Sequence, residues 1–280
     1  MFGLSLAPLL SGCSAVGAFN ALVPYDGGSS RVADGISFGP HERQKLDIYA
    51  PPEASGQPVI LFIYGGSWSS GSRSEYTFIG RALASRGFVT VIADYRLVPE
   101  IRYPEFLKDG ALALRWTRDS IKAYGGSAGN LFIMGHSAGA YNAIEIALDS
   151  RILAAAGLES GALRGAIGLA GPYDFLPIDS PITQEAFGSW PNLPETQPIN
   201  HAKASAPPIF VAAGSDDVTV YPRNTVSLAR HLRAAGASVE EKIYPGVTHA
   251  GIVTALSRPF RSKAPVLDDV VSFIHRHALS

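Results

Sequence analysis

Two serines of this sequence stand at the centre of a Gly-x-Ser-x-Gly pattern, in which a serine hydroxyl can act as a nucleophile. Ser137 lies in residues 135–139 (GHSAG), directly after an apolar run and directly before a helical pattern. A sharp strand-to-helix turn exposes such a serine above a sheet, and the small residues two positions away prevent clashes. The sequence therefore predicts Ser137 as the nucleophile.

The second match lies in residues 125–129 (GGSAG) and centres on Ser127. Here the pattern precedes the apolar run 130–134 instead of following it. Ligands of open α/β sheets bind at the carboxyl ends of the strands, so Ser127 would lie at the wrong end. We predict that Ser127 is a turn residue without a catalytic part.

A nucleophilic serine needs a general base, and in this strand–turn–helix arrangement the chain order is Ser, then Asp or Glu, then His. His249 follows the strand-like run 239–244 and would therefore lie at a carboxyl end of the sheet. The other histidines after Ser137 fall in helical runs or in an irregular stretch: His201, His231, His275 and His277. We predict His249 as the base, with His201 as a weak alternative.

The acid that orients the base should follow the apolar run 208–213, where Asp216 and Asp217 stand side by side. One of them would hold the imidazole of His249 and stabilise its charged form. Spacing does not decide between the two. Asp174, which follows the run 165–169, is a lesser candidate.

The oxyanion of an acyl-transfer reaction needs two or three fixed N–H donors. Ala138, the residue after the nucleophile, supplies one candidate N–H group. The others are expected from residues 64–68 (YGGSW), which follow the apolar run 58–64 and whose glycines allow close approach of the backbone. We predict the N–H groups of Gly66 and Ser67 as the further donors.

Strand-like and helical patterns alternate along most of the chain, which predicts an α/β fold with a mostly parallel sheet and helices on both faces. Residues 45–49 alternate like an edge strand, and continuous apolar runs at 58–64, 88–94 and 130–134 indicate buried strands. Further strands are expected at 165–169, 208–213 and 239–244. Helices are expected at 78–86, 106–122, 138–148, 223–235 and 266–279.

We expect one domain over residues 35–280, preceded by an N-terminal segment and connector at 1–34. Residues 173–208 are rich in Pro and aromatic residues and weakly periodic, which is typical of a small cap or pocket wall. The 280 residues carry 23 basic and 24 acidic side chains without a basic stripe. The charge footprint of a nucleic-acid binder is therefore missing.

Cys13 is the only cysteine, which excludes a disulfide within the chain and a cysteine metal site. It closes an apolar run in Leu10-Ser11-Gly12-Cys13, which resembles the bacterial lipobox. No Lys or Arg precedes Arg31, which departs from a usual signal peptide. The motif predicts a lipoprotein of the bacterial cell envelope or periplasm, anchored to a membrane through Cys13; without that signal the expected location is the cytoplasm.

Five motifs, taken together and in this order, resemble a known group: IYGGSW, DYRLVPE, GHSAGA, GSDDVTV and GVTHAG. They are similar to the carboxylesterase and feruloyl-esterase-like branch of the α/β-hydrolase superfamily, near the hormone-sensitive-lipase type. The resemblance runs from about residue 35 to the C-terminus. It implies Asp217 as the acid, because the family acid stands in Gly-x-x-Asp, and it implies Trp68 and Phe187 near the acyl group of the substrate.

The family's His-Gly-Gly-Gly-Trp loop reads Tyr64-Gly65-Gly66-Ser67-Trp68 in this chain. Tyr64 thus replaces a histidine, and Ser67 replaces a glycine whose backbone N–H survives the change. We expect a serine esterase that cleaves carboxylic esters of small molecules and needs no metal or organic cofactor. The alternatives are an arylformamidase acting on N-formylkynurenine and, in another class, an inactive hydrolase fold that serves as a binding protein. Acyl and alcohol groups and the oligomeric state stay open.

Overall fold

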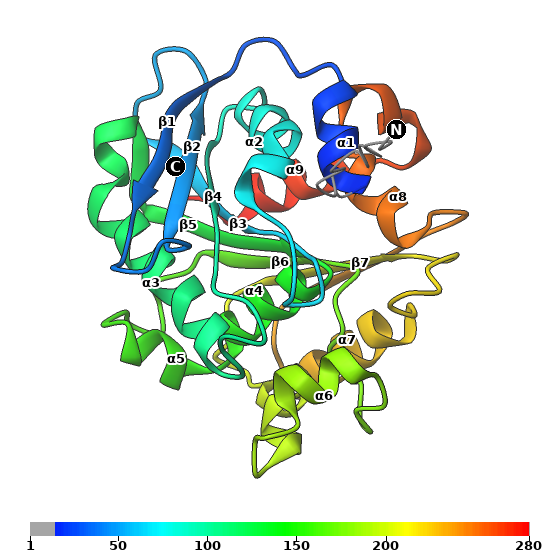
Figure 1. Cartoon of the computed structure of the whole chain (residues 1–280). Helices are drawn as coiled ribbons and strands as arrows, with labels where there is room; N and C mark the ends of the chain where they lie inside the picture. Colours follow the sequence, from blue (N-terminus) through cyan, green and yellow to red (C-terminus); the bar gives the residue numbers. More distant parts are fainter. Residues whose placement is uncertain (1–14, 280) are drawn as a thin grey trace, which may run out of the picture.

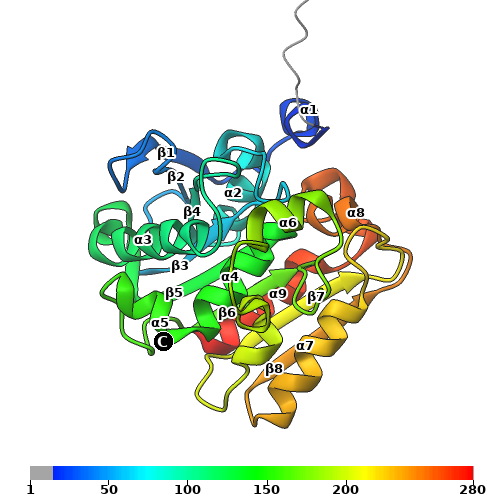
Figure 2. The same cartoon turned by 60° about the horizontal axis from the view of Figure 1, so that its bottom comes forward.

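A sheet of eight strands forms the centre of the molecule, in the order β1-β2-β4-β3-β5-β6-β7-β8 (Figures 1 and 2). The computed structural model describes residues 15–279, so Cys13 and the predicted lipobox lie outside the described residues. The strands from β4 to β8 pair in parallel, whereas β1 and β2 pair antiparallel with their neighbours. Their bounds are β1 Ser30–Ser37, β2 Lys45–Ala50, β3 Gln57–Ile63, β4 Val89–Ala93, β5 Gly126–His136, β6 Gly165–Leu169, β7 Ile209–Gly214 and β8 Val239–Tyr244.

Helices cover both faces of this sheet, as the alternation of patterns predicted. Helices α2 and α9 pack on one face, and α3, α4 and α7 pack on the other (Figure 1). The helices are α1 Ala15–Leu22, α2 Thr77–Ala84, α3 Glu105–Ser120, α4 Ala138–Leu148, α5 Ser150–Ala155, α6 Pro181–Phe187, α7 Arg223–Ala234, α8 His249–Thr254 and α9 Val266–His277. Short 3₁₀ helices occur at η1 Arg73–Tyr76, η2 Ile121–Tyr124, η3 Leu193–Thr196, η4 Pro198–His201 and η5 Arg258–Lys263. Within residues 15–279, no helix combines the length and hydropathy needed to cross a bilayer.

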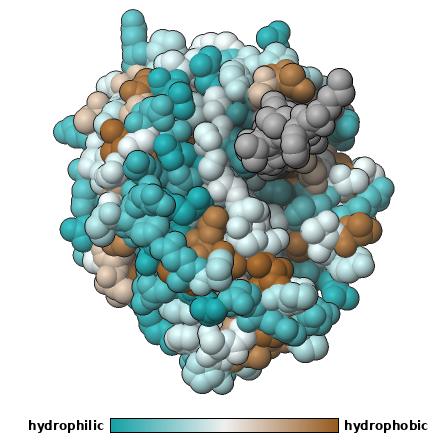
Figure 3. Space-filling model, viewed as in Figure 1, coloured by the Kyte–Doolittle hydropathy of each residue, from teal (hydrophilic) through white to brown (hydrophobic). Residues whose placement is uncertain are grey.

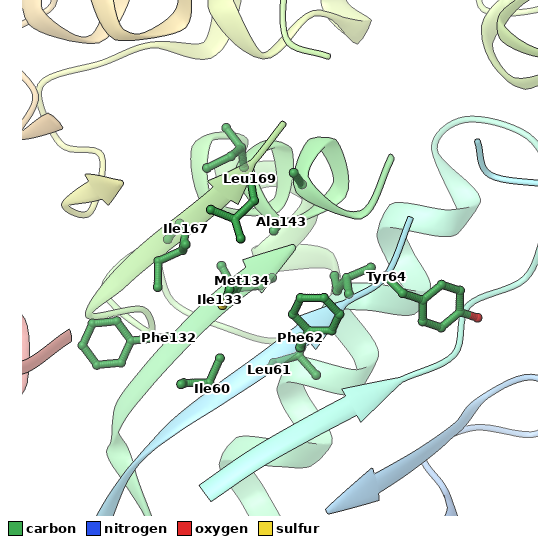
Figure 4. Packing of buried hydrophobic residues seen from close by; sticks show 14 of the residues in the cluster. Ile60, Leu61, Phe62, Tyr64, Phe132, Ile133, Met134, Ala143, Ile167 and Leu169 are labelled. Carbon is green, nitrogen blue, oxygen red and sulfur yellow. The ribbon is translucent and has the colours of Figure 1, made fainter. Parts of the chain in front are cut away.

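The core lies where β3, β5 and β6 meet the helices, and Figure 4 shows its side chains packed between strand and helix. Ile60, Phe62 and Ile133 are fully buried, because these strands have a helix layer on each side. Hydrophilic residues cover most of the face seen in Figure 3, and hydrophobic ones gather there only in small patches. The continuous apolar runs of the sequence thus correspond to the central parallel strands.

Two expectations for the first strands were wrong. The run 45–49 forms β2, but β2 lies inside the sheet between β1 and β4 and is not an edge strand. The edge is β1, which begins at Ser30 within the segment interpreted as a connector. Most residues of β1 are exposed or half-buried, and its register with β2 shifts twice, so it carries no clear apolar alternation.

The segment 173–208 forms no strand of the sheet; it contains α6, η3 and η4. Hydrogen bonds to its backbone carbonyl groups hold this segment against the rest of the domain. Tyr103 N–H donates to Ala186 O at 2.9 Å, and the Tyr141 hydroxyl donates to Thr196 O at 2.8 Å. Because Tyr141 belongs to α4, the helix that follows Ser137, the segment is fixed close to the candidate nucleophile.

Candidate active site

Ser137 occupies the turn between β5 and α4 with a backbone φ of 57° and ψ of −126°. Residues other than glycine rarely adopt a positive φ of this kind. The conformation costs free energy, and contacts with the surrounding structure must compensate for it. The turn also brings backbones into close contact. A Cβ on Gly139 would lie 2.1 Å from Ile63 O, and one on Gly135 would lie 2.1 Å from Gly139 O. Both outer glycines are therefore required by packing.

We expect Gly139→Ala to lower the free energy of unfolding by about 3 kcal/mol or more, because the added methyl group meets fixed backbone of β3. Urea denaturation measures the change. The matched control is Gly129→Ala on β5, where an added Cβ has no neighbour within 4 Å. Equal stability of the two variants would contradict the proposed constraint.

His249 and Asp217 complete a chain of hydrogen-bonding groups with Ser137. His249 Nε2 lies 2.9 Å from Ser137 Oγ, and His249 Nδ1 lies 2.7 Å from Asp217 Oδ2. The three side chains come from the carboxyl ends of β5, β7 and β8, which meet at one edge of the sheet. The structure thus brings together the three residues that the sequence analysis selected.

Asp217 is buried and its carboxylate is fully hydrogen-bonded. Burial acts to raise the pKa of Asp217, but the bonds from His249 and from the N–H groups of Val220 and Thr219 outweigh it, so the pKa lies below its ordinary value. Both N–H groups donate to Oδ1 at 2.9 Å, which leaves Oδ2 for His249. Asp217 therefore stays charged over the neutral range and can stabilise an imidazolium.

The alternative site residues lie elsewhere. Asp216 is exposed and accepts a hydrogen bond from Ser215 Oγ at 2.7 Å, and Asp174 accepts one from Ser227 Oγ at 2.6 Å. Ser127 stands at the amino end of β5, ten residues before Ser137, and lines a pocket to which Ser137 does not belong. His201 pairs with Glu145, their Nε2 and Oε1 atoms 3.1 Å apart, and does not reach Ser137 Oγ.

The loop 64–68 passes directly beside the nucleophile. An added Cβ on Gly65 would lie 2.9 Å from Ser137 Cβ. Gly66, Ser67 and Trp68 all have positive φ angles, of 118°, 51° and 59°. These successive left-handed residues make the chain turn sharply at this point. Gly66 and Ser67 line one pocket at Ser137, and Ser67 and Ala138 line the other. All three residues therefore border the space beside Ser137.

Trp68 and Phe187 do not have equal access to substrate. Trp68 lines a pocket at Ser137, and its Nε1 donates to Asn142 Oδ1 at 3.0 Å. Phe187 is fully buried and packs edge-on against Trp68, with ring centroids 4.8 Å apart. The expected contact of Phe187 with substrate was wrong: Phe187 lines neither pocket at Ser137 and supports the indole from behind, because the end of α6 packs into the hydrophobic core.

A charged network behind the loop 64–68 was not expected from the sequence. The hydroxyl of Tyr64 donates to Asp94 Oδ1 at 2.8 Å. Asp94 also binds Arg73 Nη1 at 2.5 Å, and Arg73 Nε donates to Asp47 at 2.7 Å. Burial, followed by the charge of Asp94, raises the pKa of Tyr64 well above its usual value, so its hydroxyl remains a donor. The network ties β2, β3 and β4 to the loop.

The ring of His136 holds the backbone of His249 at the start of α8. Its Nε2 lies 3.1 Å from the backbone oxygen of His249, and the ring is buried. Burial, and next the charge of His249, lowers the pKa of His136 to about 3. The neutral ring therefore donates its Nε2–H to this oxygen throughout the neutral range.

The depressed pKa of His136 predicts a pH-dependent stability. In the unfolded chain a histidine titrates near pH 6.5, so between pH 6.5 and 3 the unfolded state binds a proton that the folded state does not. The free energy of unfolding should fall as the pH falls through this window, by about 2 kcal/mol between pH 7 and 5 from this residue. Urea denaturation at both pH values should show that loss in the wild type and not in His136→Gln; parallel losses would contradict it.

Comparison with known families decides the assignment of the chain. The BD-FAE family model matches residues 46–232, which begin within β2, end within α7 and include the Ser137 turn. The chain belongs to the BD-FAE family. The resemblance to the carboxylesterase type of α/β-hydrolase is thereby confirmed, and the eight-stranded, mostly parallel sheet of this BD-FAE member has the α/β-hydrolase fold.

Relatives of this BD-FAE member carry esterase names. It is 29% identical to the isoprenylcysteine alpha-carbonyl methylesterase ICME of Arabidopsis thaliana, over 88% of this chain and 63% of that protein. It is 29% identical to esterase LipQ of Mycobacterium tuberculosis, over 86% and 62% of the two chains. Among solved structures, esterase B of Lactobacillus rhamnosis superposes with a TM-score of 0.82 at 17% identity, over 93% and 91% of the chains. The chain spans somewhat less than two thirds of the curated relatives' length.

Proposed function

We propose that this protein hydrolyses carboxylic esters of small molecules through an acyl-enzyme formed on Ser137. The observation that carries the proposal is the unbroken hydrogen-bonded chain from Asp217 through His249 to Ser137, 2.7 and 2.9 Å long. Membership of the BD-FAE family and the esterase names of its relatives support the ester bond as the target.

In the proposed reaction, His249 takes the proton of Ser137 as Oγ attacks the acyl carbonyl carbon. The negative charge that forms on the carbonyl oxygen is held by the N–H groups of Gly66, Ser67 and Ala138. Asp217 fixes the imidazole with Nδ1–H toward its carboxylate and stabilises the charged ring. His249 next gives its proton to the leaving alcohol, and water repeats the cycle on the acyl-enzyme.

The experiment combines covalent labelling with turnover. A fluorophosphonate probe should label Ser137, located by peptide mass spectrometry, and the protein should release nitrophenol from p-nitrophenyl acetate. Feruloyl esters and N-formylkynurenine belong in the same panel, because a higher kcat/KM on the formamide would favour the arylformamidase alternative. Absence of both labelling and turnover would favour the inactive binding protein.

We also propose that Cys13 receives a lipid and holds the enzyme at a bacterial membrane. The support is the tetrapeptide Leu10-Ser11-Gly12-Cys13 at the end of an apolar run. Expression of the full chain in a bacterium with an alkyne-tagged fatty acid should label the wild type and not Cys13→Ala. A wild-type chain that stays unlabelled in the soluble fraction would contradict the anchor and favour a cytoplasmic location.

A further inference from the structure

Two pockets meet at Ser137, and their walls differ in chemistry. The first, of about 470 Å³, is here called the apolar pocket, and its hydrophobic wall consists of Ala15, Val16, Phe19, Tyr76, Phe78 and Val253. The second, of about 440 Å³, has a mixed lining in which Phe175, Leu176 and Ile182 stand beside charged and polar side chains. It is called the polar pocket because, unlike the first, its wall carries Asp174, Asp179, Arg223 and Asn224. An ester bound at Ser137 has two arms, an acyl group and an alcohol group, and the two pockets offer each arm a place.

The position of His249 indicates which pocket receives the alcohol group of the ester and which receives the acyl group. His249 lines the apolar pocket together with Ala250 of the same helix, and it is not among the residues that line the polar pocket. Because His249 must give its proton to the alkoxide oxygen as the C–O bond breaks, the alcohol leaves on the side of this imidazole. The acyl group then faces the polar pocket, whose wall includes Trp68 and Ala138.

Helix α1 supplies Ala15, Val16 and Phe19 to the wall of the apolar pocket. It lies near α8, whose His249, Ala250 and Val253 line the same pocket (Figure 1). Phe19 packs against Phe78, with ring centroids 5.1 Å apart, and against Phe260 at 5.6 Å. Asn20 is buried and bonds on both sides: Nδ2 donates to Ser74 O and Oδ1 accepts from Phe78 N–H, each at 3.0 Å. These contacts hold α1 in one position, so the apolar side of this helix forms a fixed part of the pocket wall.

We propose that the apolar pocket binds the alcohol part of the substrate and selects hydrophobic alcohols, with Phe19 and Val16 of α1 as specificity-determining residues. The inference rests on the proposed ester hydrolysis and names the substrate class for it: esters of alkyl or other hydrocarbon-rich alcohols. A volume of about 470 Å³ lies within the range of small-molecule sites and accepts a chain of several methylene groups. Each methylene that leaves water should then raise kcat/KM about fourfold.

Two ester series test this assignment, with acid release followed at constant pH. In the first, acetate is esterified with ethanol, butanol, hexanol or octanol; in the second, ethanol is esterified with acids of the same lengths. We expect kcat/KM to rise steeply with length in the alcohol series and weakly in the acid series. The ratio of hexyl acetate to ethyl acetate should fall about tenfold in Phe19→Ala.

The matched control is Leu22→Ala, on the same helix but 85% exposed and outside the pocket wall, which should keep the wild-type ratio. Val16→Asp provides a second variant, which adds charge to the wall without removing the Phe19 contacts, and should lower the ratio as well. A ratio unchanged in both wall variants, or a steep rise in the acid series instead, would overturn the assignment. A wild type that hydrolyses no ester in either series would instead reject the proposed function itself.

Discussion

Replacing Ser137 by alanine should lower kcat/KM for p-nitrophenyl acetate by about 10⁴- to 10⁶-fold, because the variant has no atom that can form the acyl-enzyme. The residual rate would come from the N–H groups of Gly66, Ser67 and Ala138 and from substrate binding. The loss of one hydroxyl should change the free energy of unfolding by about 1 kcal/mol or less, since alanine at φ 57° keeps the same backbone. Initial rates together with urea denaturation measure both effects.

The matched control for this variant is Ser127→Ala, which removes the same hydroxyl from the same five-residue pattern at the opposite end of β5. Its kcat/KM should stay within about twofold of the wild type. Turnover by Ser137→Ala at more than about a hundredth of the wild-type rate would refute the acyl-enzyme on this serine.

The second large effect is expected from Asp217→Asn. Asparagine can still accept hydrogen bonds from Thr219 and Val220 through its Oδ1, so the loop keeps its shape. Its amide group would then donate to His249 Nδ1, which places the remaining proton on Nε2 and leaves no lone pair to take the proton of Ser137. We expect kcat to fall about 10⁴-fold with little change in KM.

Asp216→Asn makes the same chemical change one residue away, on an exposed carboxylate that accepts from Ser215 Oγ. It should leave kcat within about twofold of the wild type. Comparable losses in the two variants would mean that the negative charge of the loop, and not the contact of Asp217 with His249, supports turnover.

The central strands and the positions of Ser137 and His249 could be predicted from local pattern. Buried parallel strands appear in the sequence as continuous apolar runs, and a serine between such a run and a helix lies at the carboxyl end of that strand. The choice of Asp217 over Asp216 depended on family resemblance. Both residues follow the same strand, and only the direction in which each side chain points distinguishes them. That direction is set by the N–H groups of residues 219 and 220, which local pattern does not show.

Features made by contacts between distant segments could not be predicted in this way. The network of Tyr64, Asp94, Arg73 and Asp47 joins four segments. Asp47 lies within β2 and Asp94 directly after β4, and neither position indicates in the sequence that Arg73 binds both. Helix α1 was missed because its residues continue an apolar stretch that was interpreted as a signal. Phe187 was misplaced since an aromatic residue in a cap can face the substrate or the core with the same local pattern.

The separation of α1 from the catalytic loops along the chain has an evolutionary consequence. Residues that perform the proposed reaction lie between positions 66 and 249, whereas Val16 and Phe19 belong to a short helix that precedes the first strand in the chain. Mutations in that helix could therefore change which alcohols are accepted without disturbing the reaction centre. Exchange of this N-terminal helix among homologous enzymes offers a direct route to new selectivity.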